Sequence, residues 1–464
     1  MRSALAQRVQ ALANAYASED FRKAEALATR VLADDSAHPG ALHIKGAALH
    51  RLGRTEAGLE YLRRAVADNP RYALALTDLG GSLNALGRFE EGRAALEEAL
   101  AVFNENPTTH NLLGDGLRRS GAVRAALAPL RRAVQLAPRY ADAHFNLALA
   151  LLQLGELEEG FREYEWRWAL GDFPTRPLEC KQPRLHRQPL ARKTVLLQAE
   201  QGFGDAIQFA RYASYLAGRG AVVLVRCKRP LRRLLARVEG VAGTVGLRLP
   251  PFDYHCPLMS LPMVAGTTLS TIPGFAPYVA PYPTDVEKWN TRLQPLAGLK
   301  VGLVWTTEAV RPDRNPNRYD GANRDKAAKS LAPSHLAPLL AVPGISWISL
   351  QPAVLNRQMP SEMSAQIVDV SASLTDFAQT AAAITGLDLV ITVDSAVAHL
   401  AGALNRGVDT VTGECGLALA ARPIGQSVVL EHAARAPAAA GRSGAGRLGR
   451  RGGRDQREAG PASA

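Results

Sequence analysis

The spacing of hydrophobic residues divides the chain into two parts. Up to about residue 172, apolar residues recur at helical spacing, and the whole pattern repeats every 34 residues. Beyond that point, short apolar runs rich in β-branched residues alternate with helical patterns. Three sets of positions keep the 34-residue period: Gly53, Gly87, Gly121 and Gly155; Leu79, Leu113 and Leu147; and Ala65, Ala99 and Ala133. The pattern predicts an α-helical array followed by an α/β module.

A 34-residue period is typical of tetratricopeptide repeats, helix-turn-helix units that stack because one pair cannot bury its apolar face alone. Extending the register backwards places Glu19 at the turn of a degenerate first unit, in which Ala24, Ala26 and Val31 form the apolar face. We therefore expect five repeats over residues 7–172. Glycine at each turn tolerates the positive φ that ends the first helix, and small turn residues are expected to let the paired helices approach closely.

The second part contains five apolar runs that we expect to be strands: 194–200, 221–227, 300–305, 345–351 and 387–394. Runs that are apolar on both faces are typical of parallel sheets covered by helices. A proline-rich stretch at 173–192 is interpreted as a linker, and prolines between 250 and 283 separate two α/β lobes, at 193–290 and 298–407. Ligands bind such sheets beyond the carboxyl ends of the strands, which places the expected site in the cleft between the lobes.

Composition limits the kinds of protein that this chain can be. The 464-residue chain has no apolar run of about 18 residues and no apolar signal core near its start, so we expect no transmembrane segment and a cytoplasmic location. Its four cysteines are scattered, which favours reduced thiols. The net charge is +12, but the stretch from residue 432 onward supplies five of those charges. No nucleic-acid motif accompanies them, so no specific nucleic-acid partner is predicted.

The first informative motif is EQGFGDAIQFARYASYL at 200–216, a strand end that runs into a turn and a helix. Gly202 and Gly204 are expected to allow a tight turn and close backbone approach, and Gln208 lies one turn into the helix. Asp205 stands at the helix start, facing the cleft. A helix cap and a catalytic carboxylate are both consistent with this position when it is judged by spacing alone.

The second motif is VITVDSAVAHLAGALN at 390–405, again a strand, a turn and a helix. Asp394 ends the strand and Ser395 opens the helix. The free backbone N–H groups and the positive end of the helix dipole suit a diphosphate there. His399, one turn further on, is positioned to donate to a phosphate or to pin the loop. A plain helix cap with a partly buried histidine stays open as the alternative.

The two motifs, in this order and about 190 residues apart, resemble glycosyltransferase family 9, whose best-known members are lipopolysaccharide heptosyltransferases. They are especially similar to a bacterial subgroup in which tetratricopeptide repeats precede the domain. PFDYHCPLMSLP at 251–262 and KVGLVW at 300–305 share that similarity, which spans about 161–405. The resemblance implies a GT-B fold of two Rossmann-like lobes, with the acceptor on the first and the nucleotide-sugar on the second.

The resemblance also implies roles for residues. Asp205 would be the general base of an inverting transfer, and the helix that begins at Ser395, with His399, would stabilise the leaving diphosphate. Lys329 and Ser330 in NRDKAAKSL would add contacts, with a solvated loop charge as the alternative for Lys329. No Asp-x-Asp stands on a suitable loop, so a metal-independent reaction without a cofactor is predicted.

The expected partners are a nucleotide-sugar, a protein or glycan acceptor, and a protein on the concave face of the repeats. Two other readings remain open. One is a protein O-glycosyltransferase, which would differ in its acceptor. The other is a non-catalytic tetratricopeptide scaffold whose transferase module is defective.

The resemblance breaks just after Asn405, where the family would have a buried strand and then Asp-Trp-Arg-Trp. Suitable codons for residues 412–435, read one nucleotide forward, can spell PANADWRWLLARSDSPWYSSTLR. We therefore hypothesise a frameshift between Asn405 and Thr412, which would make 408–464 an aberrant tail. Resequencing the locus tests this, because an in-frame read with no lost or gained base contradicts it.

Overall fold

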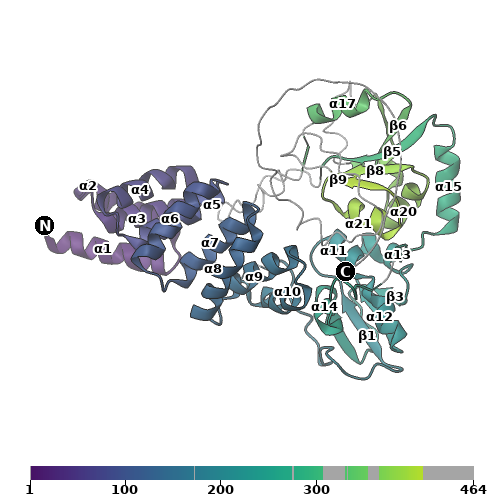
Figure 1. Cartoon of the computed structure of the whole chain (residues 1–464), viewed down its shortest axis with the longest axis horizontal. Coiled ribbons are helices and arrows are strands. Elements are labelled where there is room, and N and C mark those ends of the chain that lie inside the picture. The colour runs from purple at the N-terminus through teal and green to yellow at the C-terminus, as the bar shows by residue number, and fades with distance from the viewer. Residues whose placement is uncertain are drawn as a thin grey trace, which may run out of the picture.

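The computed structural model of the chain describes residues 2–171, 173–273, 276–306, 330–331, 333–353 and 365–410. Stacked helices form the N-terminal part, and two lobes built on parallel sheets form the rest (Figure 1). The N-terminus lies at the end of the array far from the lobes. The predicted fold class, an α-solenoid followed by two Rossmann-like lobes, is confirmed. Lys329 and the predicted tail beyond residue 410 lie outside the described residues.

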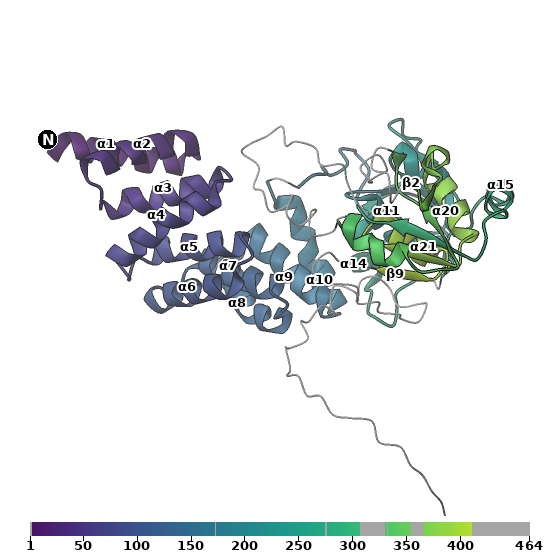
Figure 2. The same cartoon turned by 90° about the horizontal axis from the view of Figure 1, so that it is seen from above.

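Within the described part of the array, helices form five consecutive pairs that match the predicted repeats (Figure 2). Proline opens α3 and α7, where its missing N–H is no loss and its fixed φ suits the first helical turn. A 3₁₀ turn, η1 (Tyr164–Ala169), ends the fifth pair. The pairs are α1 (Arg2–Ala17) with α2 (Phe21–Asp34), α3 (Pro39–Arg51) with α4 (Thr55–Asp68), α5 (Ala73–Ala85) with α6 (Phe89–Val102), α7 (Pro107–Arg119) with α8 (Val123–Leu136), and α9 (Ala141–Gln153) with α10 (Leu157–Glu163).

The turn positions behave as the period predicts. The four turn glycines have φ of 79°, 78°, 91° and 81° in chain order, and Glu19 takes the same left-handed conformation with φ 59°. The degenerate first unit is therefore confirmed, and Ala24 and Val31 are buried as predicted. Ala26 is exposed, so its prediction is wrong, and Ala28, one helical turn from Ala24, is buried instead. Close approach of the paired helices does not occur at the turns, however, because a Cβ on Gly53 or Gly87 would meet no atom within 4 Å. That part of the prediction is wrong.

Close approach instead depends on a second set of glycines in the first helix of three units. A Cβ at these positions would lie 2.4–2.6 Å from the Cγ of a leucine in the second helix of the same unit. Any side chain there forces the helices apart. This set also has a 34-residue period, and it consists of Gly46, Gly80 and Gly114, facing Leu62, Leu96 and Leu130.

We expect Gly80→Ala to destabilise the array by about 1–3 kcal/mol, since overpacking a close helix contact costs that much. The new Cβ would lie 2.4 Å from Leu96 Cγ and 2.9 Å from the Gly92 carbonyl oxygen. Gly87→Asn is the matched control, because its Cβ enters open space and asparagine tolerates the left-handed region. Urea unfolding followed by circular dichroism compares the two. Equal unfolding midpoints would contradict the assignment.

The first lobe has a four-stranded parallel sheet in the order β3-β2-β1-β4. The two strands predicted in this lobe are present as β1 (Thr194–Gln198) and β2 (Val222–Arg226), while β3 (Val241–Val245) and β4 (Tyr254–Pro257) were not foreseen. The helices of this lobe are α11 (Phe203–Phe209), α12 (Tyr212–Gly218), α13 (Arg232–Leu235) and α14 (Leu261–Ala265). The strand order reverses between β1 and β4, so the loop after β1 lies at a topological switch point.

The second lobe has a five-stranded parallel sheet in the order β7-β6-β5-β8-β9. All three strands predicted there are present, as β5 (Leu299–Val304), β6 (Ile345–Ser349) and β8 (Leu389–Thr392). The remaining elements are β7 (Ile367–Asp369), β9 (Val408–Thr410), α17 (Ala337–Leu340), α20 (Phe377–Thr385) and α21 (Ala396–Ala403). The order reverses between β5 and β8, which brings the second motif, after β8, to the equivalent switch point.

Three domain boundaries differ from the predicted ones. The linker is not only a spacer, because Arg184 forms a parallel bridge with His255 beside β4 and Leu185 is buried. The predicted end of the first lobe at residue 290 cuts through α15 (Pro283–Leu293), which packs on α20 of the second lobe. The second lobe extends past residue 407, because β9 pairs in register with β8.

Two further expectations concern the described residues. No helix within them is long and apolar enough to cross a membrane. The three cysteines among them are Cys180, Cys227 and Cys256, and each is a free thiol.

Candidate functional site

The helices of the two motifs pack against each other between the lobes. α11 begins after β1 of the first sheet, α21 begins after β8 of the second, and they make extensive contact (Figure 1). Gly204 lies against His399, so closely that a Cβ on Gly204 would be 2.5 Å from His399 Cδ2. Beside them the rings of Phe203 and Phe377 are 5.1 Å apart between centroids. Residues far apart in the sequence therefore meet in one site.

The loop between β1 and α11 places Asp205 at the first turn of α11. The N–H of Gly202 donates to Asp205 Oδ2 at 3.0 Å, so the carboxylate does act as part of a helix cap. Asp205 remains partly exposed, and Gln208, one turn beyond Gly204, is buried. The structure thus supports the capping role and leaves the exposed part of the carboxylate accessible for a second one.

The glycines of this loop do not supply the left-handed residue of the turn. The left-handed residue of the turn is Gln201, with φ 59°, while Gly202 is extended with φ −78° and ψ 167°. A Cβ on Gly202 would make a tight contact, 3.0 Å from Asp205 Oδ2, and a Cβ on Gly204 would clash with His399. Close approach, the other half of the prediction, accounts for both.

The loop between β8 and α21 places Ser395 at the N-cap of α21. Its hydroxyl accepts from the Val397 N–H at 3.2 Å and lies 2.9 Å from Thr392 Oγ1. Asp394 directly precedes it, and His399 is partly buried against Gly204. Capping by Ser395 fixes the direction in which the first turn of α21 presents its backbone N–H groups.

Two further residues, Lys329 and Ser330, were predicted to contact the nucleotide-sugar. The structure describes Ser330, and Lys329 lies outside the described residues. The Ser330 hydroxyl lies 2.9 Å from Thr306 Oγ1, just beyond the end of β5. Because β5 and β8 are neighbours, Ser330 lies at the same carboxyl edge of the sheet as Ser395. The structure therefore brings Ser330, Asp394, Ser395 and His399 to one edge, and α11, which carries Asp205, packs on α21 through Gly204.

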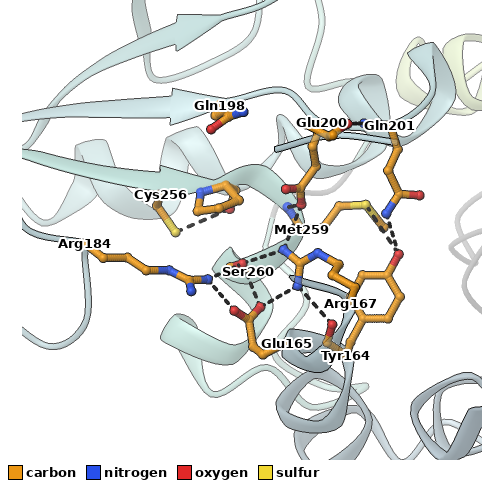
Figure 3. A network of polar contacts seen from close by, with 12 residues as sticks. Tyr164, Glu165, Arg167, Arg184, Gln198, Glu200, Gln201, Cys256, Met259 and Ser260 are labelled. Carbon is orange, nitrogen blue, oxygen red and sulfur yellow. Dashed lines mark hydrogen bonds and ion pairs between the residues drawn. The ribbon is translucent and has the colours of Figure 1, made fainter. Parts of the chain in front are cut away.

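Sequence reasoning missed a buried charge cluster next to this loop (Figure 3). Arg167, in η1 at the end of the array, is 0% exposed. Its Nη1 donates to Glu165 Oε1 at 2.7 Å, and its Nη2 donates to Glu200 Oε1 at 2.9 Å. A buried guanidinium is tolerated only when carboxylates and further acceptors surround it. The buried charge cluster consists of Glu165, Arg167, Arg184, Glu200 and Ser260.

Hydrogen bonds tie this cluster to the sheet edge. Ser260 Oγ lies 2.7 Å from a guanidinium nitrogen of Arg167 and 2.7 Å from one of Arg184. The Met259 N–H donates to Glu200 Oε1 at 3.1 Å. Glu200 follows β1 and Met259 follows β4, so the cluster closes the switch point of the first sheet. Its only trace in the sequence is the alternation of charged and aromatic residues in YEWRWA, where the repeats end.

Burial and the neighbouring arginines together set the pKa values of the two glutamates apart. Burial raises the pKa of the Glu200 carboxyl to about 7, against the opposing pull of Arg167. Burial acts upward on Glu165 as well, but Arg167 and Arg184 together hold the pKa of Glu165 below its ordinary value. Glu165 is therefore the firmly ionised partner of the arginines.

The raised pKa of Glu200 predicts a pH dependence of stability. Between its ordinary value of 4.5 and about 7 the folded state binds more protons than the unfolded chain, so the free energy of unfolding falls as pH rises through this window. Glutamine does not titrate, so the free energy of unfolding of Glu200→Gln should not fall for this reason. Relative to wild type, the stability of the variant should therefore rise by up to about 3 kcal/mol between pH ~4.5 and ~7.5. Stability that depends on ionised Glu165 is lost only below this window. Urea titrations at the two pH values measure the free energy of unfolding of variant and wild type. If the difference between them is the same at both pH values, the assignment is contradicted.

Within the ranges that the structure describes, no group of three or more His, Cys, Asp or Glu side chains is arranged to hold a metal ion. Metal independence of the reaction stays a prediction.

Family models match both parts of the chain. Tetratricopeptide repeat models match residues 13–73, 49–115 and 114–155. The model of glycosyltransferase family 9 (heptosyltransferase) matches residues 352–425. The chain thus combines segments similar to tetratricopeptide repeats with a segment similar to glycosyltransferase family 9. The family 9 match contains Asp394, Ser395 and His399, and it runs beyond residue 405, where we expected the similarity to end. Asp205 lies outside the matched residues.

The chain is also similar, at low identity, to a curated protein and to solved structures. Protein FlbA of Caulobacter vibrioides is 28% identical over 328 residues, which cover 63% of this chain and 52% of FlbA. The chain thus spans about half the length of this curated relative. Among solved structures, the tetratricopeptide protein TTC0263 of Thermus thermophilus covers 37% of this chain and 93% of its own, with 23% identity and a TM-score of 0.33. A MamA structure covers 33% and 90%, with 20% identity and a TM-score of 0.30.

Proposed function

We propose that this protein transfers a sugar from a nucleotide-sugar donor to an acceptor hydroxyl, with inversion at the anomeric carbon. The observation that carries the proposal is the contact of Gly204 with His399, because it packs the first turn of α11 against α21, and each helix follows a switch-point loop. The start of one helix offers a carboxylate and the start of the other offers backbone N–H groups. Those are the two groups that a displacement between a hydroxyl and a diphosphate ester requires.

Asp205 is the general base in this proposal. As the acceptor oxygen forms its bond to the anomeric carbon, the bond from that carbon to the diphosphate oxygen breaks, and the hydroxyl proton passes to Asp205. The bond from the Gly202 N–H fixes one carboxylate oxygen at 3.0 Å. The carboxylate is therefore held in place before the substrates arrive, which is how positioning contributes to rate.

The first turn of α21 stabilises the leaving nucleoside diphosphate. Charge on the diphosphate grows as the bond breaks, and backbone N–H groups at a helix start stabilise it without needing to reorganise. His399 contributes from the second turn of α21, and Ser330 from the neighbouring strand end. Lys329 is proposed as a further phosphate contact.

The repeats recruit the acceptor or a partner protein. The array and the first lobe share one continuous buried apolar cluster, which includes Phe161 and Tyr164 of the last repeat and Phe209 of α11. The rings of Phe161 and Phe209 are 6.0 Å apart between centroids. Because the last repeat packs directly on the helix that carries Asp205, an extended peptide bound on the array would be held at a constant distance from the site. This favours a protein as the acceptor.

The test is release of nucleoside diphosphate. The chain is incubated with a panel of nucleotide-sugars, and a version restored to the hypothesised frame is assayed beside it. Release from a particular donor by the chain itself is the expected result. Release only from the restored version would favour the scaffold reading for this chain, and release from neither would contradict the proposal.

A further inference from the structure

We propose that the end of the repeat array, through Tyr164 and Arg167 of η1, holds the turn before α11 in the conformation that directs Asp205. Both are positioning residues, which act through Gln201 and Glu200 and not on substrate. The inference rests on the proposed function for its effect on turnover, but the contacts themselves are independent of it.

The first contact restrains a strained residue. Gln201 has φ 59°, a conformation that a residue other than glycine adopts only when its surroundings enforce it. Its Nε2 donates to the Tyr164 hydroxyl at 2.6 Å, and its N–H donates to Thr175 Oγ1 at 3.3 Å. Both partners lie outside the Rossmann-like lobe, one at the end of the repeats and one in the linker.

Tyr164 is suited to this restraint. Its side chain is buried, and burial raises its pKa to about 12, so the hydroxyl stays protonated. The hydroxyl accepts from Gln201 and lies 3.9 Å from Met259 Sδ, as Figure 3 shows. A neutral, buried phenol can hold the amide of Gln201 without attracting water.

The second contact fixes the residue before Gln201. Glu200 is 2% exposed, and its Oε1 accepts from Arg167 Nη2 at 2.9 Å. Two consecutive residues, Glu200 and Gln201, are thus bonded to two residues of one 3₁₀ turn. Gly202 follows them, and its N–H is the donor to Asp205 at 3.0 Å. A shift of η1 is therefore passed through three residues to the carboxylate.

The experiment uses the full chain with Tyr164→Phe, which removes the hydroxyl that accepts from Gln201, and Glu200→Leu, which removes the oxygen that accepts from Arg167. Both substitutions nearly preserve size. Tyr212→Phe is the matched control, because that buried hydroxyl donates to Thr267 Oγ1 at 2.9 Å in the same lobe without touching the loop. We expect amide hydrogen exchange over residues 201–206 to be at least several-fold faster in the two test variants than in the control. Exchange equal to that of the control would overturn the proposal.

Turnover supplies a second, distinguishable readout. With a donor that the wild type uses, Tyr164→Phe should lower kcat by about ten- to a hundredfold with donor Kd unchanged, as expected when a catalytic group is displaced. Gln201→Gly removes both the strain and the amide that Tyr164 holds. Tyr164→Phe should therefore lower kcat less in the Gln201→Gly background than in the wild type. An equal loss in both backgrounds would overturn the role of Gln201. If no donor is turned over, the proposed function fails, while hydrogen exchange still tests the restraint.

Discussion

Asp205→Asn should lower kcat by about 10²- to 10⁴-fold, the usual contribution of a general base, while donor Kd stays nearly unchanged. The reason lies in the bond from the Gly202 N–H to Asp205 Oδ2 at 3.0 Å. An asparagine carbonyl oxygen can still accept this bond, so the helix cap survives. Only the ability to take up a proton is lost. Nucleoside diphosphate release and donor titration measure the two quantities.

Asp205→Ala separates the two roles of this residue, because it removes the cap as well as the base. If capping were the only role, the asparagine variant would keep wild-type turnover and only the alanine variant would be impaired. Asp253→Asn is the matched control, since Asp253 pairs with Lys193 at 3.0 Å near the start of β1, away from the site. It should leave kcat unchanged.

Gly204→Ala should separate the two motif helices. The new Cβ would lie 2.5 Å from His399 Cδ2 and 3.0 Å from His399 Nε2, so the ring or the helix must move. We expect a loss of about 1–3 kcal/mol in the free energy of unfolding, as for other overpacked contacts. Turnover should fall with it, because the helix that carries Asp205 would shift relative to α21. Chemical unfolding and product release measure the two effects.

Gly402→Ala in α21 is the control, because its Cβ would meet no atom within 4 Å and alanine favours helix. A double-mutant cycle with His399→Ala identifies the partner. Removing the ring should restore part of the stability that Gly204→Ala loses, although the double variant would still lack the proposed phosphate contact. Strictly additive losses would show that the clash lies elsewhere.

The hydrophobic pattern predicted much of the fold because its signals are local. A 34-residue period identified the repeat turns, including the left-handed Glu19, and continuous apolar runs identified five of the strands. The four strands that it missed are short, interrupted or less apolar: β3 contains Gly243, β4 ends at Pro257, and β7 and β9 have only three residues each. Such segments become strands because a neighbouring strand offers its backbone groups, and spacing along the chain does not report that.

The sequence by itself determined the two motifs and the element on which each lies. It placed Asp205 and Ser395 at helix starts after buried strands, because strand, turn and cap signals occupy neighbouring positions. It determined the turn conformations of the array for the same reason. A helix start, however, is consistent with a plain cap as well as with a site.

Only the tertiary structure decided that the two motif helices meet. Gly204 and His399 are joined by the packing of one lobe on the other, and no local pattern encodes that distance. The buried charge cluster likewise draws on the last repeat, the linker and two strand ends, so its partners are distant in sequence. Burial and pairing of charges depend on which segments come together in space, and for that reason the restraint on Gln201 is visible only in the folded chain.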